Sequence, residues 1–478
     1  MSTNEHAPAD QLRRCLQQKT ATIGVIGLGY VGLPLAVEYA DQDFSTIGID
    51  LDETRVQKLN DGVNYNDDLD DERIRRLVAE GHLRATSSYD EADDIDVFFV
   101  CVPTPVTEHK DPDTTYIEAA TASIAEHLRP GQLVILKSTT YPTTTETVVQ
   151  PLLEDAAAEK GLRMGEDVFL AFSPERIDPG NETYTLENTP VVVGGVTPTA
   201  TDLAEQVTAQ VVGTVHTVSS ARVAEMEKLL ENIYRSVNIA LVNELAQLCD
   251  RIGVSMWEVV EAAATKPFGF QAFYPGPGLG GHCIPVDPHY LSWLAREYDF
   301  ETSFITLSAR VNEEMPHYVT NAVVQAVANQ PIRLSDASVL LLGVAFKPNV
   351  DDTRHSPAYT VTKLLRERGV DTIRFADPHV EQFRVSEPDG EELPSVNLTP
   401  EVIQSHDVAV VLADHDAFDY EHIATHSSCV VDTRNAVADN VDGELPNVRT
   451  LGGGGFRDGA TPVPARGDSE VSEYERSF

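Results

Sequence analysis

A glycine-rich turn near the start of the chain restricts its possible folds more than any other feature. Gly27, Gly29 and Gly32 form the pattern GxGxxG between the apolar run 22–27 and a helical stretch. Glycine at these positions allows a tight turn and lets a pyrophosphate approach the N-terminus of the helix. The turn therefore predicts a dinucleotide-binding lobe, the alternative being a glycine-rich turn in an ordinary α/β protein.

An acidic residue at the end of the next apolar run makes the first interpretation more specific. Asp50 follows Gly32 by eighteen residues. A carboxylate there can accept hydrogen bonds from both hydroxyls of an adenosine ribose and repels the 2′-phosphate of NADP, which favours NAD. Arg55 lies one helical turn further on and is either an adenosine contact or a solvated helix charge. The predicted cofactor-binding residues of this region are Gly27, Gly29, Tyr30, Val31, Gly32, Asp50 and Arg55.

Short apolar runs separated by helical patterns indicate two sheets. The runs of the first sheet are 22–27, 46–50, 95–102, 133–137 and 168–172. A second group begins near residue 337 and comprises SVLLLGVAF, TIRFADP, DVAVVLADH and CVVDTRN. Strands that alternate with helices favour parallel sheets, whose carboxyl edges bind ligands. We therefore predict an α/β fold with two Rossmann-like, doubly wound parallel-sheet lobes.

The segment between the lobes has a different pattern. From about 220 to 265 apolar residues recur at helical spacing, with no Gly or Pro for thirty residues, which predicts one long helix. A second helical region is expected from 288 to about 328. The predicted boundaries are an N-terminal extension at 1–20, a first lobe at 21–215, a central helical region at 216–330, a second lobe at 331–455 and a flexible acidic tail at 456–478.

The charge of the chain excludes one large class of partners. The formal net charge is −41, and most of the 35 basic residues are Arg. A nucleic-acid-binding protein needs the opposite sign, so that class is disfavoured. Because the acidic residues are spread along the chain, we interpret the charge as adaptation of the surface to high salt, as in a halophilic protein. No apolar run is long enough to span a bilayer and no signal peptide is visible, so we expect a cytoplasmic protein without membrane insertion.

One of the five cysteines lies in an unusual loop. None of the cysteines forms a CxxC pair, so neither a disulfide framework nor a metal site is predicted. Cys283 lies in the Gly- and Pro-rich segment PGPGLGGHCIPVDP, and Asp287 follows four residues later. Such a loop exposes backbone amides that suit a phosphorylated ligand. A helix starting near Pro285 would lower the pKa of the thiol, whereas the alternative is a structural turn with a buried thiol.

Seven motifs in order give the chain a family resemblance. They are GLGYVGLPLA, KSTTYP, FSPERIDPGN, EKLLENIYRSVNIALVNELA, PGPGLGGHCIPVDP, AFKPNVDDTRHSPA and VVDTRN. In these motifs the chain resembles the UDP-glucose/GDP-mannose dehydrogenase family over about residues 20–455. The resemblance implies an NAD-binding first lobe, a central region that mediates homodimers or higher homo-oligomers, a UDP-binding second lobe, and two NAD-dependent oxidations at C6 of a UDP-sugar.

The resemblance also implies roles for single residues. Cys283 would be the nucleophile that carries a thiohemiacetal and then a thioester, Lys228 and Asn232 would stabilise oxyanions, Thr139 and Asp287 would position water, and Glu175 would assist hydrolysis. Further cofactor contacts are assigned to Thr104, Thr139 and Arg354. Substrate contacts are assigned to Glu175, Arg176, Lys228, Asn232, Phe273, Tyr274, Gly278, Gly280, Lys347 and Arg434.

The choice of sugar depends on departures from the UDP-glucose dehydrogenase pattern. Pro179 stands where those enzymes carry a second acid, and the thiol is followed by IPVD instead of FxKD. PERxxPGN and KPFGFQAFYPGPG instead resemble dehydrogenases of UDP-N-acetylhexosamines, with UDP-N-acetylglucosamine the preferred substrate and a uronate for surface glycans the product. The alternatives are UDP-N-acetylmannosamine or UDP-glucose as substrate, a non-catalytic nucleotide-sugar binding protein, and a two-electron alcohol dehydrogenase.

Overall fold

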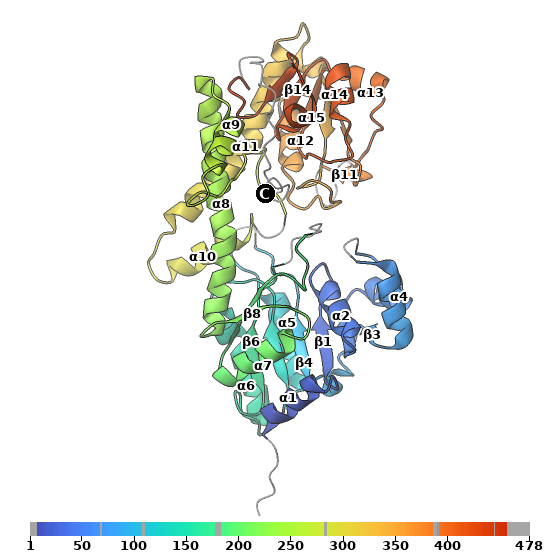
Figure 1. Cartoon of the computed structure of the whole chain (residues 1–478), viewed down its shortest axis with the longest axis vertical. Coiled ribbons are helices and arrows are strands. Elements are labelled where there is room, and N and C mark those ends of the chain that lie inside the picture. The colour runs from blue at the N-terminus through green and yellow to red at the C-terminus, as the bar shows by residue number, and fades with distance from the viewer. Residues whose placement is uncertain are drawn as a thin grey trace, which may run out of the picture. The chain divides into compact units, whose positions relative to one another are not determined.

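The chain divides into two compact units. The computed structural model describes residues 7–66, 69–107, 110–176, 183–281, 284–385, 390, 392–443 and 445–456 (Figure 1). The first unit is Met1–Glu231 with His289–Phe300, and the second is Asn232–Pro288 with Glu301–Phe478. Each unit is described by itself.

A mostly parallel sheet forms the centre of the first unit. Among the described residues its eight strands have the order β3-β2-β1-β4-β5-β6-β7-β8. The bounds are β1 Thr22–Ile26, β2 Ser45–Ile49, β3 Leu83–Thr86, β4 Val97–Val100, β5 Leu133–Leu136, β6 Phe169–Phe172, β7 Val191–Gly195 and β8 Val215–Thr217. The order β3-β2-β1-β4-β5-β6 is that of dinucleotide-binding folds, so the predicted fold class is confirmed. Only the pairing of β6 with β7 is antiparallel among these strands.

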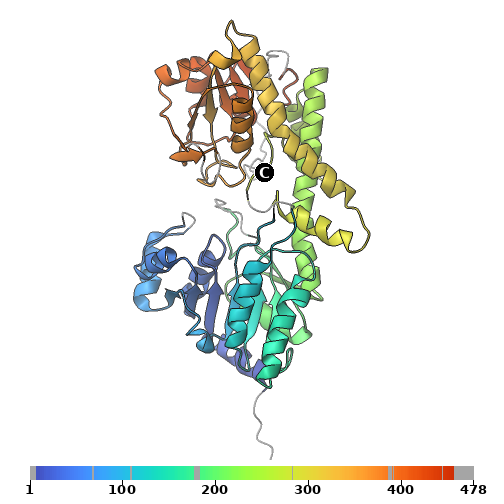
Figure 2. The ribbon, with the colours of Figure 1, turned by 180° about the vertical axis from the view of Figure 1, so that it is seen from behind.

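Helices cover both faces of this sheet. Their bounds are α1 Pro8–Gln17, α2 Gly32–Asp41, α3 Glu53–Asn60, α4 Asp71–Glu80, α5 Thr115–Glu126, α6 Gln150–Glu159 and α7 Pro198–Thr208, with short turns at Ala92–Asp94 and Thr145–Val149. Alternate residues of β4 explain the two layers, because Val97 and Phe99 pack with α1, α2 and α7 while Phe98 and Val100 pack with α5 and α6. Figure 2 shows α5 and α6 side by side on one face of the sheet.

The first helix lies within the predicted N-terminal extension. Ala9, Leu12 and Leu16 are buried in the core of the first unit, and Arg13 pairs with Asp202 of α7 at 2.7 Å. Residues 8–17 are therefore part of the folded lobe.

Long helices make up the central region. They are α8 Ala221–Ile252, α9 Met256–Ala264, α10 Asp287–Arg296 and α11 Ser303–Ala328. The predicted long helix is confirmed as α8, which has 32 residues and ends before Gly253. Helix α10 begins at Asp287, two residues beyond the expected Pro285. Within the described ranges no helix is long and apolar enough to cross a membrane.

A second parallel sheet lies in the second unit. In the described chain its order is β10-β9-β13-β14-β15, beside a small β11-β12 hairpin. The strands are β9 Ser338–Leu342, β10 Thr372–Ala376, β11 Gln382–Arg384, β12 Glu392–Pro394, β13 Val408–Val411, β14 Val430–Asp432 and β15 Val448–Thr450. The direction of chain progression reverses between β9 and β13, and such a switch point is where open α/β sheets bind ligands.

The second sheet is also covered on both faces. Its helices are α12 Pro357–Glu367, α13 Pro400–Gln404, α14 Tyr420–His426 and α15 Ala436–Asn440, with a turn at Leu334–Asp336. Val339 and Leu341 of β9 pack with α11 and α12, whereas Leu340 and Leu342 pack with α13, α14 and α15. The second lobe is thus doubly wound, as predicted.

The folded chain extends one residue into the predicted tail. Phe456 is fully buried in the second unit and stacks on Tyr318 with ring centroids 5.6 Å apart. Next to this pair, Asp250 of α8 accepts hydrogen bonds from the backbone of Gly452 and Gly454. Phe456 is therefore part of the second unit, and the rest of the predicted tail lies outside the described residues.

We predict that Phe456→Ala lowers the unfolding free energy by about 3–5 kcal/mol, because it removes a buried aromatic side chain. Urea unfolding of the second unit measures the loss. Phe268→Ala is the control, since that side chain is 71% exposed, and it should change stability by less than about 0.5 kcal/mol. Equal effects of the two changes would contradict the burial of Phe456.

Candidate active site

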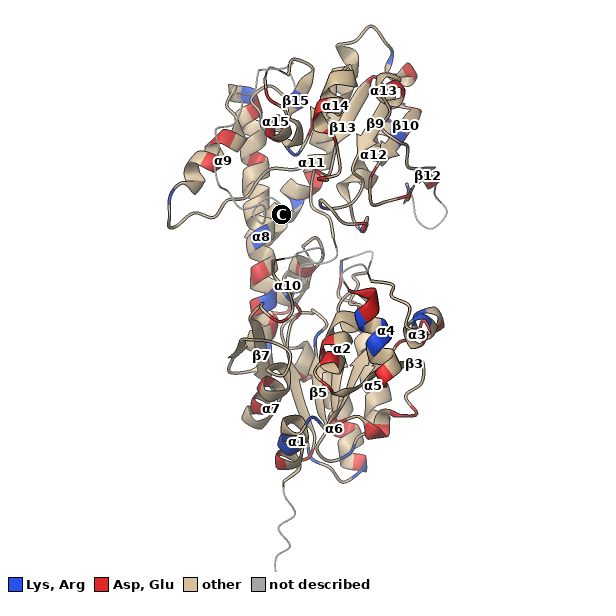
Figure 3. Cartoon of the chain, turned by 45° about the vertical axis from the view of Figure 1, so that its right-hand side comes forward, with Lys and Arg blue, Asp and Glu red and all other residues tan. Residues whose placement is uncertain are grey.

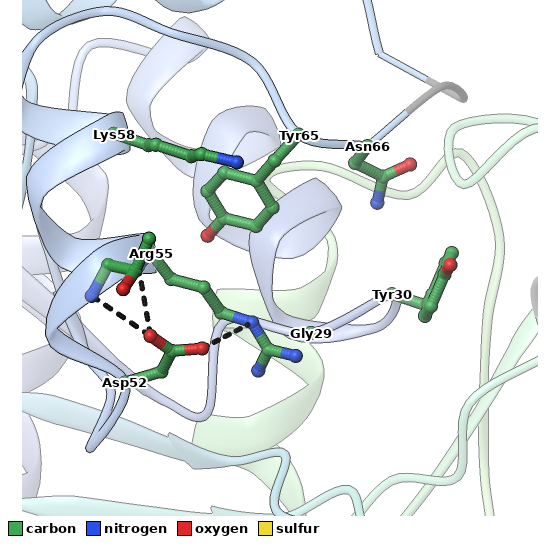
Figure 4. Close-up of a pocket in the computed structure, with 8 residues that line it drawn as sticks. Gly29, Tyr30, Asp52, Arg55, Lys58, Tyr65 and Asn66 are labelled. Atoms are coloured by element: carbon green, nitrogen blue, oxygen red, sulfur yellow. Dashed lines mark hydrogen bonds and ion pairs between the residues drawn. The ribbon is translucent and has the colours of Figure 1, made fainter.

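The glycine-rich turn forms one wall of a pocket in the first unit. The pocket has a volume of about 250 Å³ and is lined by Gly29, Tyr30, Asp52, Thr54, Arg55, Lys58, Tyr65 and Asn66. Figure 4 shows Arg55 and Asp52 on one side of it and Lys58 near Tyr65 on the other. The predicted Gly29, Tyr30 and Arg55 thus line one cavity.

The turn itself has the close backbone contacts that its glycines predicted. A Cβ on Gly32 would lie 1.8 Å from the carbonyl oxygen of Gly27, so no other residue fits there. A Cβ on Gly29 would meet nothing within 4 Å. Gly29 therefore faces open space, which lets a pyrophosphate reach the backbone beside the N-terminus of α2. The residues present fit a dinucleotide.

Asp50 fixes the turn from the neighbouring strand. Its carboxylate accepts a hydrogen bond from the Leu28 N–H at 2.7 Å and lies 3.5 Å from the Arg55 guanidinium. Tyr65 donates from its hydroxyl to the Leu28 carbonyl at 3.1 Å. Burial and the Asp50 charge raise the pKa of Tyr65, so the phenol keeps the proton that it donates. The backbone N–H and the carbonyl of Leu28 are therefore both hydrogen-bonded.

Five of the residues that line the pocket were not predicted from the sequence: Asp52, Thr54, Lys58, Tyr65 and Asn66. Lys58 lies one helical turn beyond Arg55, and that spacing could have identified it. Tyr65 lies in the segment GVNYND after α3, and no local motif identified it.

Predicted residues meet at the carboxyl ends of β4, β5 and β6. Thr104 is buried and its carbonyl accepts a hydrogen bond from Tyr290, while Thr139 is half-buried after β5. Glu175 follows β6 and lies 3.3 Å from the ammonium group of Lys137, which is 4% exposed. Lys137 was not predicted, although KST belongs to one of the seven motifs.

The long helix carries the two predicted oxyanion-stabilising residues. Lys228 and Asn232 are four residues apart and both are buried. In the second unit the Asn232 amide donates to the Asp287 carboxylate at 2.5 Å, and Asp287 is 2% exposed. The structure thus brings together Asn232 and Asp287, two residues 55 positions apart. Cys283 and Pro179 lie outside the described residues.

The thiol loop packs against the second lobe within the second unit. A Cβ on Gly276 would lie 2.8 Å from the Arg434 guanidinium, and the Gly276 N–H donates to Asn243 at 2.9 Å. A Cβ on Gly280 would lie 2.6 Å from Phe346, the neighbour of Lys347. The Gly281 N–H donates to the Arg354 carbonyl at 3.0 Å. The predicted loop and the predicted basic residues therefore belong to one region, and Gly278 lies between these contacts.

Buried polar groups support the carboxyl edge of the second sheet. Asp432 at the end of β14 accepts from the backbone of Arg434 and Val437, and burial raises the pKa of Asp432 to about 6. Asp377 at the end of β10 accepts from the Val344 N–H at 2.7 Å and lies 3.1 Å from His415. These bonds fix the turns that carry Lys347 and Arg434.

The two predicted aromatic substrate contacts lie in a hydrophobic cluster. Phe273 is 3% exposed and contacts Tyr234, while Tyr274 is 5% exposed and stacks on Trp257 of α9. In this structure both rings support the loop, and their contact with substrate stays a prediction.

Three of the described cysteines are poor nucleophiles. Burial raises the pKa of the Cys101 thiol to about 12 and also raises the pKa values of Cys249 and Cys429. The thiolate is the reactive form, so these three thiols are inert near neutral pH.

Comparison with known proteins agrees with this geometry. The chain matches the NAD binding domain of the UDP-glucose/GDP-mannose dehydrogenase family over residues 21–212, its central domain over 222–314 and its UDP binding domain over 340–439. The chain belongs to the UDP-glucose/GDP-mannose dehydrogenase family. It is an NAD-dependent nucleotide-sugar dehydrogenase, as the seven motifs predicted.

Individual relatives are similar over most of their length. The NDP-N-acetyl-D-galactosaminuronic acid dehydrogenase of Ralstonia solanacearum is 36% identical over 88% of this chain and 97% of that protein. The UDP-N-acetyl-D-glucosamine 6-dehydrogenase of Pseudomonas aeruginosa is 37% identical over 76% of this chain and 84% of that protein. The solved UDP-D-ManNAc dehydrogenase of Pyrococcus horikoshii is 32% identical with a TM-score of 0.80, covering 91% of this chain and 100% of that one.

We predict that Gly29→Ala weakens NAD binding by about tenfold or more, equal to about 1.4 kcal/mol, because the methyl group occupies the pyrophosphate approach. The unfolding free energy should change by less than about 1 kcal/mol, since the methyl meets no atom of the chain. Calorimetric titration with NAD and urea unfolding measure the two effects.

Gly32→Ala is the matched comparison, because its methyl group would collide with Gly27. It should lower both stability and NAD affinity. Unchanged NAD affinity in Gly29→Ala would contradict the assignment of the turn to the pyrophosphate.

Proposed function

We propose that the chain oxidises the C6 hydroxymethyl group of a UDP-N-acetylhexosamine, specifically UDP-N-acetylglucosamine, to the uronate. The observation that carries the proposal is the buried Asn232–Asp287 pair beside the thiol loop GGHCIPVDP. A buried carboxylate held by a buried amide is costly to maintain for binding alone, and it suits a reaction in which charge develops on oxygen.

The proposed reaction removes four electrons in two stages. NAD supplies a hydride acceptor for each oxidation. C6 of the alcohol first becomes an aldehyde, and the Cys283 sulfur adds to it to form a thiohemiacetal. Loss of a second hydride and a proton gives a thioester, and water then breaks the C–S bond to release the acid and the free thiol. The sum consumes two NAD and one water and yields two NADH and three protons.

The residues of this chain have distinct tasks in the proposal. Lys228 and Asn232 stabilise negative charge on the C6 oxygen, Asp287 and Thr139 hold water, and Glu175 assists attack on the thioester. Lys347 and Arg434 bind the diphosphate, because Lys347 follows β9 at the switch point of the second sheet and the Arg434 guanidinium donates to the Leu412 carbonyl after β13.

The choice of epimer depends on the loop before the thiol. Relatives named for three different N-acetylated sugars match at similar identity, so identity alone does not select one. The segment KPFGFQAFYPGPG favours UDP-N-acetylglucosamine over UDP-N-acetylmannosamine and UDP-glucose. A product of this kind supplies surface glycan biosynthesis.

Two chains are proposed to associate through α8. Exposed apolar side chains recur along it with the spacing of one helix face: Val223, Met226, Leu230, Tyr234, Leu241, Leu248 and Ile252. Such a face on a central helix fits a second copy of the same face in a two-fold dimer, which buries it from water.

The environment of the protein is also a proposal. The free cysteines among the described residues suit a reducing compartment, so we propose the cytoplasm, where nucleotide sugars and NAD are available. Figure 3 shows Asp and Glu residues spread over many elements, which supports adaptation to high salt.

The direct test offers the purified protein NAD with UDP-N-acetylglucosamine, UDP-N-acetylmannosamine and UDP-glucose, in dilute buffer and in molar KCl. We expect two NADH per molecule of UDP-N-acetylglucosamine and greater activity in KCl. Cys283→Ser should abolish acid formation and leave NAD binding unchanged, whereas Cys429→Ser is the control.

One NADH per sugar would instead support a two-electron alcohol dehydrogenase. No turnover with any UDP-sugar would support the non-catalytic binding protein. Normal acid production by Cys283→Ser would exclude the proposed nucleophile.

We predict that Leu241→Glu combined with Leu248→Glu converts the dimer to a monomer, because two buried carboxylates cannot be tolerated at the interface. Sedimentation equilibrium measures the mass, and Lys363→Glu on α12 is the control that should stay dimeric. An unchanged mass for the double variant would rule out this face as the interface.

A further inference from the structure

One arginine in the first unit is held by two glutamates of the long helix. Arg176 lies in the loop after β6, and Glu227 and Glu231 lie on successive turns of α8. The Arg176 guanidinium donates to Glu231 at 2.6 Å and also to Glu227. Its other terminal nitrogen donates to the Pro190 carbonyl at 2.8 Å. The side chain therefore ties the loop after β6 to α8 and to the segment before β7.

Glu227 and Glu231 would repel each other if no cation lay between them. Like charges four residues apart destabilise a helix. Burial and the nearby Glu227 raise the pKa of Glu231 to about 7, while Arg176 and Lys228 oppose that rise. Near neutral pH Glu231 is therefore partly protonated, and Arg176 balances the remaining negative charge. A local conflict of this kind is typical of a functional position.

The backbone of the same arginine contacts a predicted catalytic carboxylate. The Arg176 N–H donates to one oxygen of Glu175 at 2.8 Å, and Lys137 lies 3.3 Å from the other oxygen. The Glu175 carboxylate is thus held from two sides. Because Arg176 supplies one of these donors from its backbone, movement of its side chain would move that donor and turn Glu175.

We propose that Arg176, Glu227 and Glu231 are positioning residues that hold Glu175 in place for hydrolysis of the thioester. This inference rests on the proposed function. It gives Arg176 an indirect role in place of the substrate contact expected from the sequence. It also gives a task to Glu227 and Glu231. The chain has Pro179 where UDP-glucose dehydrogenases carry a second acid.

The test compares Arg176→Gln, Arg176→Lys and the control Arg163→Gln in rapid-mixing and steady-state assays of NADH formation. Arg163 is a matched control because it also pairs with two carboxylates, Glu166 and Asp167, but its side chain is 69% exposed. Arg176→Gln should form the first two NADH per site at the normal rate and then turn over about 10- to 100-fold more slowly, with KM within about threefold. Arg176→Lys should recover part of the lost rate, and Arg163→Gln should behave as the unchanged protein.

A normal steady-state rate in Arg176→Gln would overturn the inference. An equal fall in the rate of forming the first two NADH and in the steady-state rate would also overturn it, since this would indicate general loss of structure. If the wild-type protein oxidises no UDP-sugar, the proposed function itself is contradicted. This outcome is distinct from failure of the inference about Arg176.

A second variant covers the case in which Arg176→Gln does not fold. The charged groups that face Glu231 are Glu227 and Lys228 on its own helix and Arg176 from the loop after β6. The ionised Glu231 carboxylate holds Arg176 more strongly than the protonated form does. The steady-state rate of the wild-type protein should therefore rise with pH through about 7. Glu231→Gln should lose this rise, and its persistence would overturn the inference.

Discussion

A carboxylate at the end of the second strand fixes the turn after the first strand in both lobes. In the first lobe Asp50 accepts a hydrogen bond from the Leu28 N–H at 2.7 Å. In the second lobe Asp377 accepts from the Val344 N–H at the same distance. A backbone turn at the carboxyl edge of a parallel sheet exposes unpaired N–H groups, and the carboxylate pairs one of them. The ligand-binding edge of each lobe depends on this bond.

The residues around this hydrogen bond differ between the two lobes, and so do the ligands that each lobe suits. Around Asp50 the turn is glycine-rich and opens at Gly29, so the backbone is accessible to a pyrophosphate. Around Asp377 the buried His415 occupies the space beside the carboxylate, and the cationic side chains Lys347 and Arg434 lie on neighbouring turns. The first lobe therefore presents an open glycine-rich backbone beside Arg55 and Lys58, and the second presents Lys347 and Arg434, which suits a cofactor in one and a nucleotide diphosphate in the other.

Much of this arrangement could be predicted from the sequence. Apolar runs gave the positions of nine strands, and the GxGxxG turn gave the cavity that Gly29, Tyr30 and Arg55 line. The antiparallel β7 was not predicted, because a buried run such as VVVGG carries no information on strand direction. Tyr65, Glu227 and Glu231 were missed because their roles depend on contacts between segments that are distant in the chain. Phe456 was assigned to the tail because its polar neighbours outweighed one aromatic residue.

The proposed reaction requires a covalent step at Cys283, and mass spectrometry can detect that step directly. Glu175→Gln should slow hydrolysis, so acid quenching after mixing with NAD and UDP-N-acetylglucosamine should trap the thioester. We expect the peptide that contains Cys283 to gain the mass of the UDP-N-acetylglucosaminuronyl group and to lose it on treatment with hydroxylamine. An unmodified Cys283 peptide, found while NADH accumulates beyond one equivalent per site, would contradict the thioester mechanism.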